Sequence, residues 1–230
     1  MSGDIYASLS GARAAWTGLE LLSNNIANAS TTGFKADRMT FRSEGPGGHV
    51  LGASYAVAEF SSPDERAGTV VSDGVPTHLA LEGRGWFALS DPSGPLFTRD
   101  GRFSLDTEGR LVGAGGRLVV GRDGPIQVPE GETIRIDEIG TVFGSESGEI
   151  GLIQVQDAPV RALGDNLYLP TGPIEVGDAR VIQGGLESSN VDPLSAMVSL
   201  IEATRYVEAF QKAMQASDEL SSRLNRVGGR

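Results

Sequence analysis

Few residues of this chain have the types and spacing that carry chemistry in proteins. The 230-residue sequence has no cysteine and two histidines, His49 and His78, which are far apart. Zinc sites need several cysteine or histidine ligands at short spacing, and disulfides or thiol nucleophiles need cysteine. The sequence therefore predicts a protein with no metal site, no disulfide and no thiol chemistry.

Asp100, Asp106 and Glu108 are close enough in the sequence to suggest an acid–base pair or a calcium site. Asp100 and Glu108 each precede a glycine, however, and this dipeptide is a signal of a tight turn. Turn formation explains the acidic residues without catalysis, so we predict no catalytic role for them. A hydrolase on a β-rich scaffold that uses these carboxylates is the alternative.

A glycine cluster at Gly113, Gly115 and Gly116 is the nearest approach to a phosphate-binding loop. A dinucleotide fingerprint needs a helix directly after the glycines, and no helical pattern follows them. No nucleophile elbow is present either. We therefore expect a turn here, no small-molecule cofactor and no enzymatic activity.

The central part of the chain has the pattern of an antiparallel β domain. Glycine makes up 32 of the 230 residues. Short apolar runs between turn residues recur across residues 71–189, at the spacing of a barrel or sandwich rather than of βαβ units. Residues 36–70 are expected to form an extended connector with one hairpin. The predicted fold class is thus α+β, with a central antiparallel domain resembling a β-barrel or sandwich.

Residues 1–35 are expected to form the N-terminal helix of an assembly domain. Bulky residues alternate at intervals of four and three, which is a heptad seam. Small residues repeat in the same way two positions later, about 200° around the helix. Glycine inside a helix costs about 1 kcal/mol relative to alanine, so this helix needs packing on more than one side. The predicted interface residues are Ile5, Leu9, Ala12, Trp16, Leu19 and Ile26 on the seam, and Gly11 and Gly18 on the small stripe.

Residues 190–230 are expected to form the C-terminal helix of the same assembly domain. Asp192 is a suitable N-cap and Pro193 fits the first helical position. The predicted interface residues on this helix are Met197, Leu200, Thr204, Val207 and Met214. We expect the two terminal helices to pair as a coiled coil. Two helices cannot bury both stripes of the first one, which predicts self-association; the alternatives are an ordinary monomeric core and an adaptor that binds another protein.

Charge and hydropathy exclude further classes. The net charge is −11, and all of it falls within residues 36–189. Nonspecific nucleic-acid binding needs a basic surface, so no nucleic-acid partner is expected. No apolar run approaches the roughly 18 residues of a membrane span, and the first residues lack a basic segment followed by an apolar one. We expect neither direct membrane insertion nor a cleaved signal peptide.

Several blocks of the sequence resemble signatures of the bacterial flagellar rod and hook protein family. They occur in the order found in that family and span nearly the whole chain. They are Asn24–Lys35, Leu81–Leu89, Phe97–Leu105 with Gly109–Val112, and Gly185–Pro193.

The resemblance implies a structural subunit of the flagellar basal body, located in the rod within the periplasm. Its implied partners are other subunits of the proximal and distal rod and the flagellar type III export apparatus. Hook proteins are much longer, and the segment 124–134 looks most like a proximal-rod member. A distal-rod member is the alternative; the chain has no long insertion after the first helix, which makes that alternative weaker.

Overall fold

A computed structural model describes the backbone of residues 2–44 and 55–228. Side chains are described at residue 11, from 13 to 39, from 62 to 216 and at 219. The chain forms two compact units. Unit 1 comprises Met1–Ala27, Arg38–Ser61 and Asp192–Arg230, and unit 2 comprises Asn28–Asp37 and Ser62–Val191.

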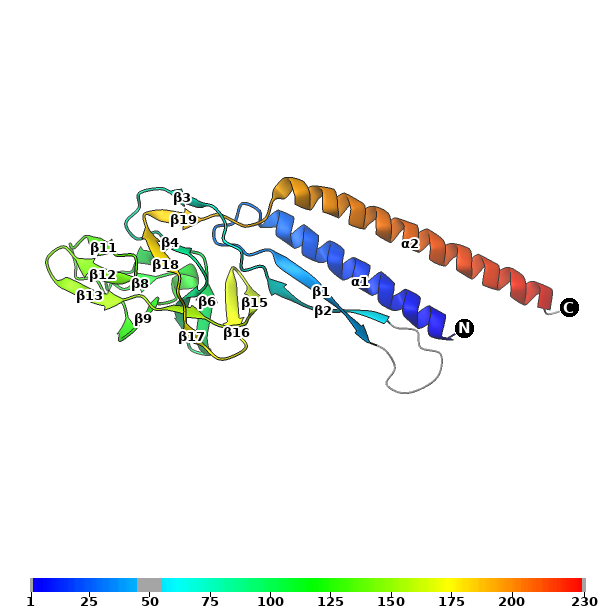
Figure 1. Ribbon diagram of the computed structural model, residues 1–230, viewed down its shortest axis with the longest axis horizontal. Helices are drawn as coiled ribbons and strands as arrows, with labels where there is room; N and C mark the ends of the chain where they lie inside the picture. The colour runs from blue at the N-terminus through cyan, green and yellow to red at the C-terminus, as the bar shows by residue number, and fades with distance from the viewer. Residues whose placement is uncertain (1, 45–54, 229–230) are drawn as a thin grey trace. The chain divides into compact units, whose positions relative to one another are not determined.

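Unit 1 is built from the two long helices and a two-stranded sheet. Helix α1 spans Ser2–Ala27 and helix α2 spans Pro193–Gly228. The two helices run side by side in opposite directions, and the chain termini lie at the same end of the pair (Figure 1). Strands β1 (Asp37–Glu44) and β2 (Tyr55–Pro63) pair with each other.

Helix α2 begins where the sequence predicts. Pro193 is its first residue, and the Asp192 carboxylate accepts a hydrogen bond from the Leu194 N–H at 3.2 Å and another from the Ser195 hydroxyl. These bonds satisfy groups that have no partner within the first helical turn. They also lower the pKa of Asp192, because they favour its charged form.

Unit 2 consists of short antiparallel strands. The largest sheet has six strands in the order β15-β16-β6-β5-β14-β17, and a second has the order β11-β12-β13. The remaining pairs are β10-β9, β18-β4, β19-β3 and β7-β8. The bounds are β3 Val70–Ser72, β4 Leu79–Glu82, β5 Trp86–Asp91, β6 Gly94–Thr98, β7 Ser104–Leu105, β8 Leu111–Val112, β9 Val120–Gly121, β10 Gly124–Pro125, β11 Ile134–Ile136, β12 Thr141–Gly144, β13 Gly148–Leu152, β14 Val155–Asp157, β15 Val160–Gly164, β16 Leu167–Pro170, β17 Glu175–Val176, β18 Arg180–Gln183 and β19 Gly185–Glu187.

The core of unit 2 lies on both faces of β5. Phe87 and Leu89 point into the main apolar cluster, where Phe87 meets Phe103 edge to face at 5.0 Å between ring centroids. Trp86 and Ala88 point into a second cluster on the opposite face. Since successive side chains of a strand alternate between faces, a continuous apolar run is what a strand buried on both sides requires.

The α+β class is confirmed, whereas a closed β-barrel does not form among the described residues. The strands of unit 2 are divided among six separate sheets, and many are only two or three residues long. A barrel needs a continuous hydrogen-bonded register around its circumference, which such short strands cannot maintain. The glycine cluster expected to form a turn lies in a short 3₁₀ helix at Ala114–Gly116.

Within the described ranges, no helix is both long enough and apolar enough to cross a membrane.

Candidate assembly surface

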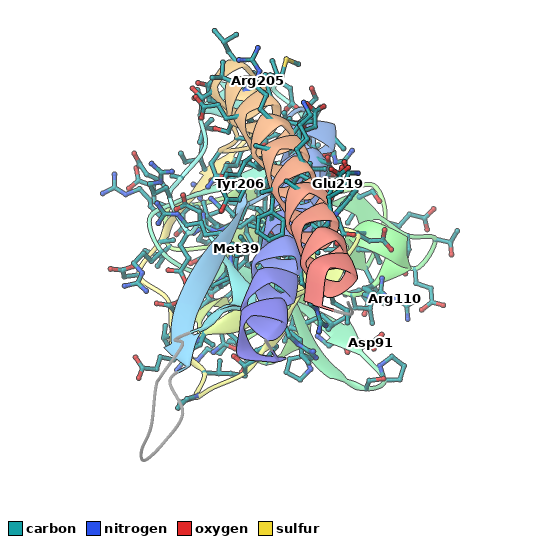
Figure 2. All side chains as sticks on the ribbon, turned by 90° about the vertical axis from the view of Figure 1, so that its right-hand side faces the viewer. Met39, Asp91, Arg110, Arg205, Tyr206 and Glu219 are labelled. Atoms are coloured by element: carbon teal, nitrogen blue, oxygen red, sulfur yellow. The ribbon has the colours of Figure 1, made fainter. Side chains whose placement is uncertain are left out.

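The small stripe of α1 packs inside unit 1. A Cβ at Gly11 would lie 3.7 Å from the ring of Phe210 on α2, and a Cβ at Gly18 would lie 3.1 Å from Met39 Cε on β1. Ala14, on the same stripe, is buried. Met39 is seen beside α1 in Figure 2. The small residues thus allow α2 and β1 to approach the α1 backbone closely.

The bulky seam of α1 lies on another face of the helix and is only partly covered where it is described. Trp16 is 50% exposed, and Leu19 and Ile26 are partly buried. Ile5, Leu9 and Ala12 lie within α1, but their side chains are outside the described residues. An exposed tryptophan in the middle of a helical seam is a feature of protein interaction surfaces.

The predicted seam of α2 is divided between buried and exposed positions. Val207 is buried and Leu200 is partly buried, whereas Met197 and Met214 are exposed. Thr204 is also exposed, and its hydroxyl donates a hydrogen bond to the Leu200 carbonyl at 2.8 Å within the helix. The buried members lie on the side of α2 that carries Phe210, which contacts α1.

An exposed apolar stripe on the first turns of α2 was missed by the sequence reasoning. Its members follow one helical face at intervals of three and four residues. Ile201, one of them, precedes Phe210 by nine residues, which places it about 180° around the helix from that contact with α1. The helical spacing of these residues is visible in the sequence. The predicted seam ran through Met197 and Leu200, however, and so included only one residue of the stripe. The stripe consists of Leu194 (74% exposed), Met197 (50%), Val198 (50%) and Ile201 (55%).

Beyond Ile201, the exposed residues of α2 include charged, polar and apolar side chains. Arg205, Tyr206 and Glu219 lie on exposed parts of the helix (Figure 2). We name two surfaces from these observations. The seam surface is Trp16, Leu19 and Ile26 of α1, and the stripe surface is Leu194, Met197, Val198 and Ile201 of α2.

The residues considered for chemistry have structural partners. The Asp100 carboxylate accepts bonds from Arg102 Nη2 at 2.6 Å and Nε at 2.9 Å, and it also caps its own turn. Asp106 pairs with Arg110 Nε at 2.8 Å. His78 Nδ1 lies 2.5 Å from Asp73 Oδ2, and His49 falls outside the described residues. Where side chains are described, no group of three or more potential metal ligands comes together.

Unit 2 contains a buried cluster of charges that the sequence reasoning did not find. Lys35, Arg99 and Glu187 are each no more than 2% exposed. Glu187 accepts bonds from Lys35 Nζ at 2.6 Å and from Arg99 Nη1 at 3.1 Å. Burial lowers the pKa of both Lys35 and Arg99, because desolvation disfavours a charge, and Glu187 partly opposes that shift.

Tyr168 lies beside this cluster, and burial raises its pKa to about 12. Its hydroxyl oxygen accepts a bond from the Lys35 backbone N–H at 3.4 Å. The folded state therefore holds the phenolic proton more tightly than the unfolded chain, in which tyrosine has a pKa near 10.0. This proton contributes stability that is fully present below pH 10 and is lost as the pH rises to about 12.

We expect Tyr168→Phe to reduce the loss of unfolding free energy that occurs as the pH rises. The free energy of unfolding in urea would be measured at pH 9 and pH 11.5 for the wild type and the variant. The wild type should lose about 2 kcal/mol more than the variant across this interval. Tyr206→Phe, at a tyrosine that is 63% exposed, is the control that retains the buried hydroxyl. Equal losses in the wild type and Tyr168→Phe would contradict the expectation.

Comparisons with known proteins show which family this chain belongs to. Three family models match: the flagellar basal body rod protein model over residues 5–35, the flagellar hook protein FlgE/F/G D1 domain over 80–144, and the flagellar basal body rod FlgEFG protein C-terminal model over 182–227. The flagellar basal-body rod protein FlgF of Caulobacter vibrioides is 35% identical over 99% of both chains. The chain belongs to the flagellar basal-body rod protein family.

Other relatives support the same assignment. FlgF of Rhizobium meliloti is 30% identical and covers 100% of this chain and 99% of its own length. FlgG of Caulobacter vibrioides is 31% identical over 92% of this chain and 94% of its own length. The resemblance inferred from the sequence blocks is thereby confirmed, and each block lies within a range that a family model matches. Such relatives support a structural rod subunit.

Proposed function

We propose that this rod-family protein is a structural subunit of the proximal rod, of the FlgF type, that assembles through its terminal helices into the shaft of the flagellar basal body. The rod lies in the periplasm. The subunit reaches it through the flagellar type III export apparatus, without cleavage of a signal peptide. Its partners are the other subunits of the proximal and distal rod. A distal-rod role of the FlgG type is the second candidate, because relatives with that name also match over nearly the full length.

The observation that carries this proposal is the exposure of apolar side chains on unit 1, at Trp16 of the seam surface and at all four residues of the stripe surface. The small stripe of α1 is already packed against Phe210 and Met39. The seam surface and the stripe surface therefore remain available for other subunits. Burying a large apolar side chain contributes about 1.5–3 kcal/mol, and a tubular assembly repeats that contribution in every subunit.

We further propose that the terminal helices pack as a coiled coil in the assembled rod. In this packing, the side chains of the seam surface fill the spaces between residues on neighbouring helices. Residues Ile5, Leu9 and Ala12 extend the seam towards the N-terminus. On α2, Thr204 and Met214 are exposed to neighbouring helices, and Val207 belongs to the pairing of α2 with α1. The role is structural rather than enzymatic, in agreement with the ion pairs that engage Asp100 and Asp106.

The test is incorporation into basal bodies in a strain that lacks the gene. Restoring the chain should restore swimming, and the tagged chain should copurify with basal bodies. A proximal subunit must be in place before the distal rod is added. We therefore expect basal bodies from the null strain to lack the FlgG-type subunit. If the FlgG-type subunit assembles normally without this chain, the proximal assignment is wrong; if the chain is absent from basal bodies, the rod role is wrong.

A further inference from the structure

Glu187 is the meeting point of three segments of unit 2 that are far apart in the sequence. Its carboxylate receives Lys35 Nζ at 2.6 Å, Arg99 Nη1 at 3.1 Å and the Gly68 backbone N–H at 2.8 Å. The Glu187 side chain is completely buried, and the exposed fractions of Lys35 and Arg99 are 1% and 2%. One buried carboxylate thus faces two buried cations, so the three side chains carry a net charge of +1 when all are ionised.

The backbone around Glu187 joins the same segments. The Glu187 carbonyl accepts the Gly33 N–H at 2.6 Å. Asn190 accepts the Ala36 N–H at 2.7 Å and donates its side-chain amide to the carbonyls of Asp64 and Arg66 at 2.7 and 2.9 Å. We name this region the junction; it consists of residues 28–37, 62–69 and 185–191.

The junction coincides with the places where the chain passes between the two units. Unit 2 begins at Asn28 and is left after Asp37, and it is re-entered at Ser62 and left again after Val191. All four passages therefore lie at the ends of the junction segments. The contacts at Glu187 hold the segment that follows α1 to the segment that precedes α2.

Electrostatics make this arrangement depend on Glu187 more than on either cation. Removing one partner of a buried ion pair leaves an uncompensated charge, which is strongly destabilising. Without Glu187, both Lys35 and Arg99 would lose that carboxylate. Hydrogen bonds from these two side chains to the uncharged carbonyl oxygens of Arg66, Leu81 and Gly83 would remain. Without Lys35, in contrast, Glu187 and Arg99 still form a balanced pair.

We propose that the junction is a charge-dependent clamp in which Glu187, on the segment that precedes α2, is the positioning residue that holds segment 28–37 against the rest of unit 2. Loss of the Glu187 charge opens the junction while the strands of the core stay paired. The clamp ties the two helix-bearing ends of the chain to one buried carboxylate. It goes beyond the assembly role, because it concerns the single subunit.

The test is hydrogen exchange of the full-length monomer. Glu187→Gln keeps the size of the side chain and an oxygen acceptor but removes the charge. The amides of Gly33, Ala36 and Gly68 should exchange at least tenfold faster in this variant, whereas the Leu89 amide, opposite Leu96 in the β5–β6 pair, should keep its protection. Lys35→Met should accelerate the junction amides by a smaller factor. Asp106→Asn is the control, since it breaks an ion pair with Arg110, which is 37% exposed.

A triple variant separates charge from shape. Lys35→Met and Arg99→Met combined with Glu187→Gln remove both cations along with the carboxylate charge, so the junction amides should recover at least part of their protection. If Glu187→Gln alone unfolds unit 2 and exposes the Leu89 amide as well, recovery in the triple variant is the deciding result. Wild-type exchange at the junction in Glu187→Gln, or no recovery in the triple variant, would overturn the proposal.

Discussion

Trp16→Asp is expected to leave the isolated subunit folded and to abolish its incorporation into the rod. Trp16 is 50% exposed, so the aspartate side chain would be solvated in the monomer and should change its stability little. In an assembled rod the same position would place a charge without a partner in an apolar contact. The lost burial alone is worth about 1.5–3 kcal/mol per contact, which weakens each association at least tenfold.

The measurement combines circular dichroism of the purified subunit with swimming and basal-body content in a complemented null strain. Export would be measured separately from the secreted fraction. Thr17→Asp is the matched control, because it places the same charge on the next, exposed residue of α1 and off the seam. Ile201→Asp tests the stripe surface in the same way. Normal incorporation of an exported Trp16→Asp subunit would show that the seam surface is not an assembly contact.

Gly33→Ala is expected to destabilise unit 2 far more than an alanine at another left-handed glycine. Gly33 has φ +67°, and an added Cβ would lie 2.3 Å from the backbone carbonyl of Arg99. The left-handed conformation costs a non-glycine residue about 1–2 kcal/mol, and forced overpacking adds about 1–3 kcal/mol. The Gly33 N–H also donates to the Glu187 carbonyl, so a displaced backbone would disturb the junction.

Gly116→Ala separates the two contributions. Gly116 has a similar φ of +72°, but nothing lies within 4 Å of an added Cβ. This variant should therefore carry only the conformational cost. Free energies of unfolding from urea titrations would compare the two variants with the wild type. Equal losses for Gly33→Ala and Gly116→Ala would mean that the close approach to Arg99 is not a rigid constraint.

Local patterns in the sequence were sufficient to predict the start of α2 and the two stripes of α1, whereas α1 ends at Ala27 rather than near residue 35. Asp192 and Pro193 mark the start of α2, because capping depends on residues within one turn of each other. The two stripes of α1 follow from helical periodicity alone, and so does the need to pack more than one side. The turn at Glu108 and Gly109 was also predictable, and it joins the paired strands β7 and β8. The Asp100–Gly101 dipeptide does not form the hairpin that it predicted, because β6 pairs with β5 and β16 rather than with β7.

Tertiary structure decided which stripe of α1 packs within the subunit. Both stripes had helical spacing, but only the small one lets the ring of Phe210 and the Met39 side chain approach the helix backbone. It also decided the extent of unit 2, which includes residues 28–37 and 62–70 that the sequence reasoning had assigned to the first helix and the connector. A barrel or sandwich was predicted from strand spacing, and spacing carries no information about whether short strands share one register.

The buried charges of the junction show most clearly where the sequence alone is insufficient. Lysine, arginine and glutamate are common surface residues, so nothing in the sequence marks Lys35, Arg99 and Glu187 as buried. Lys35 and Glu187 are also 152 positions apart. Helical and strand periodicities relate residues a few positions apart, so they could predict caps, turns and apolar faces. Pairing of buried charges depends on which distant segments meet in a site without water, and only the folded chain brings those segments together.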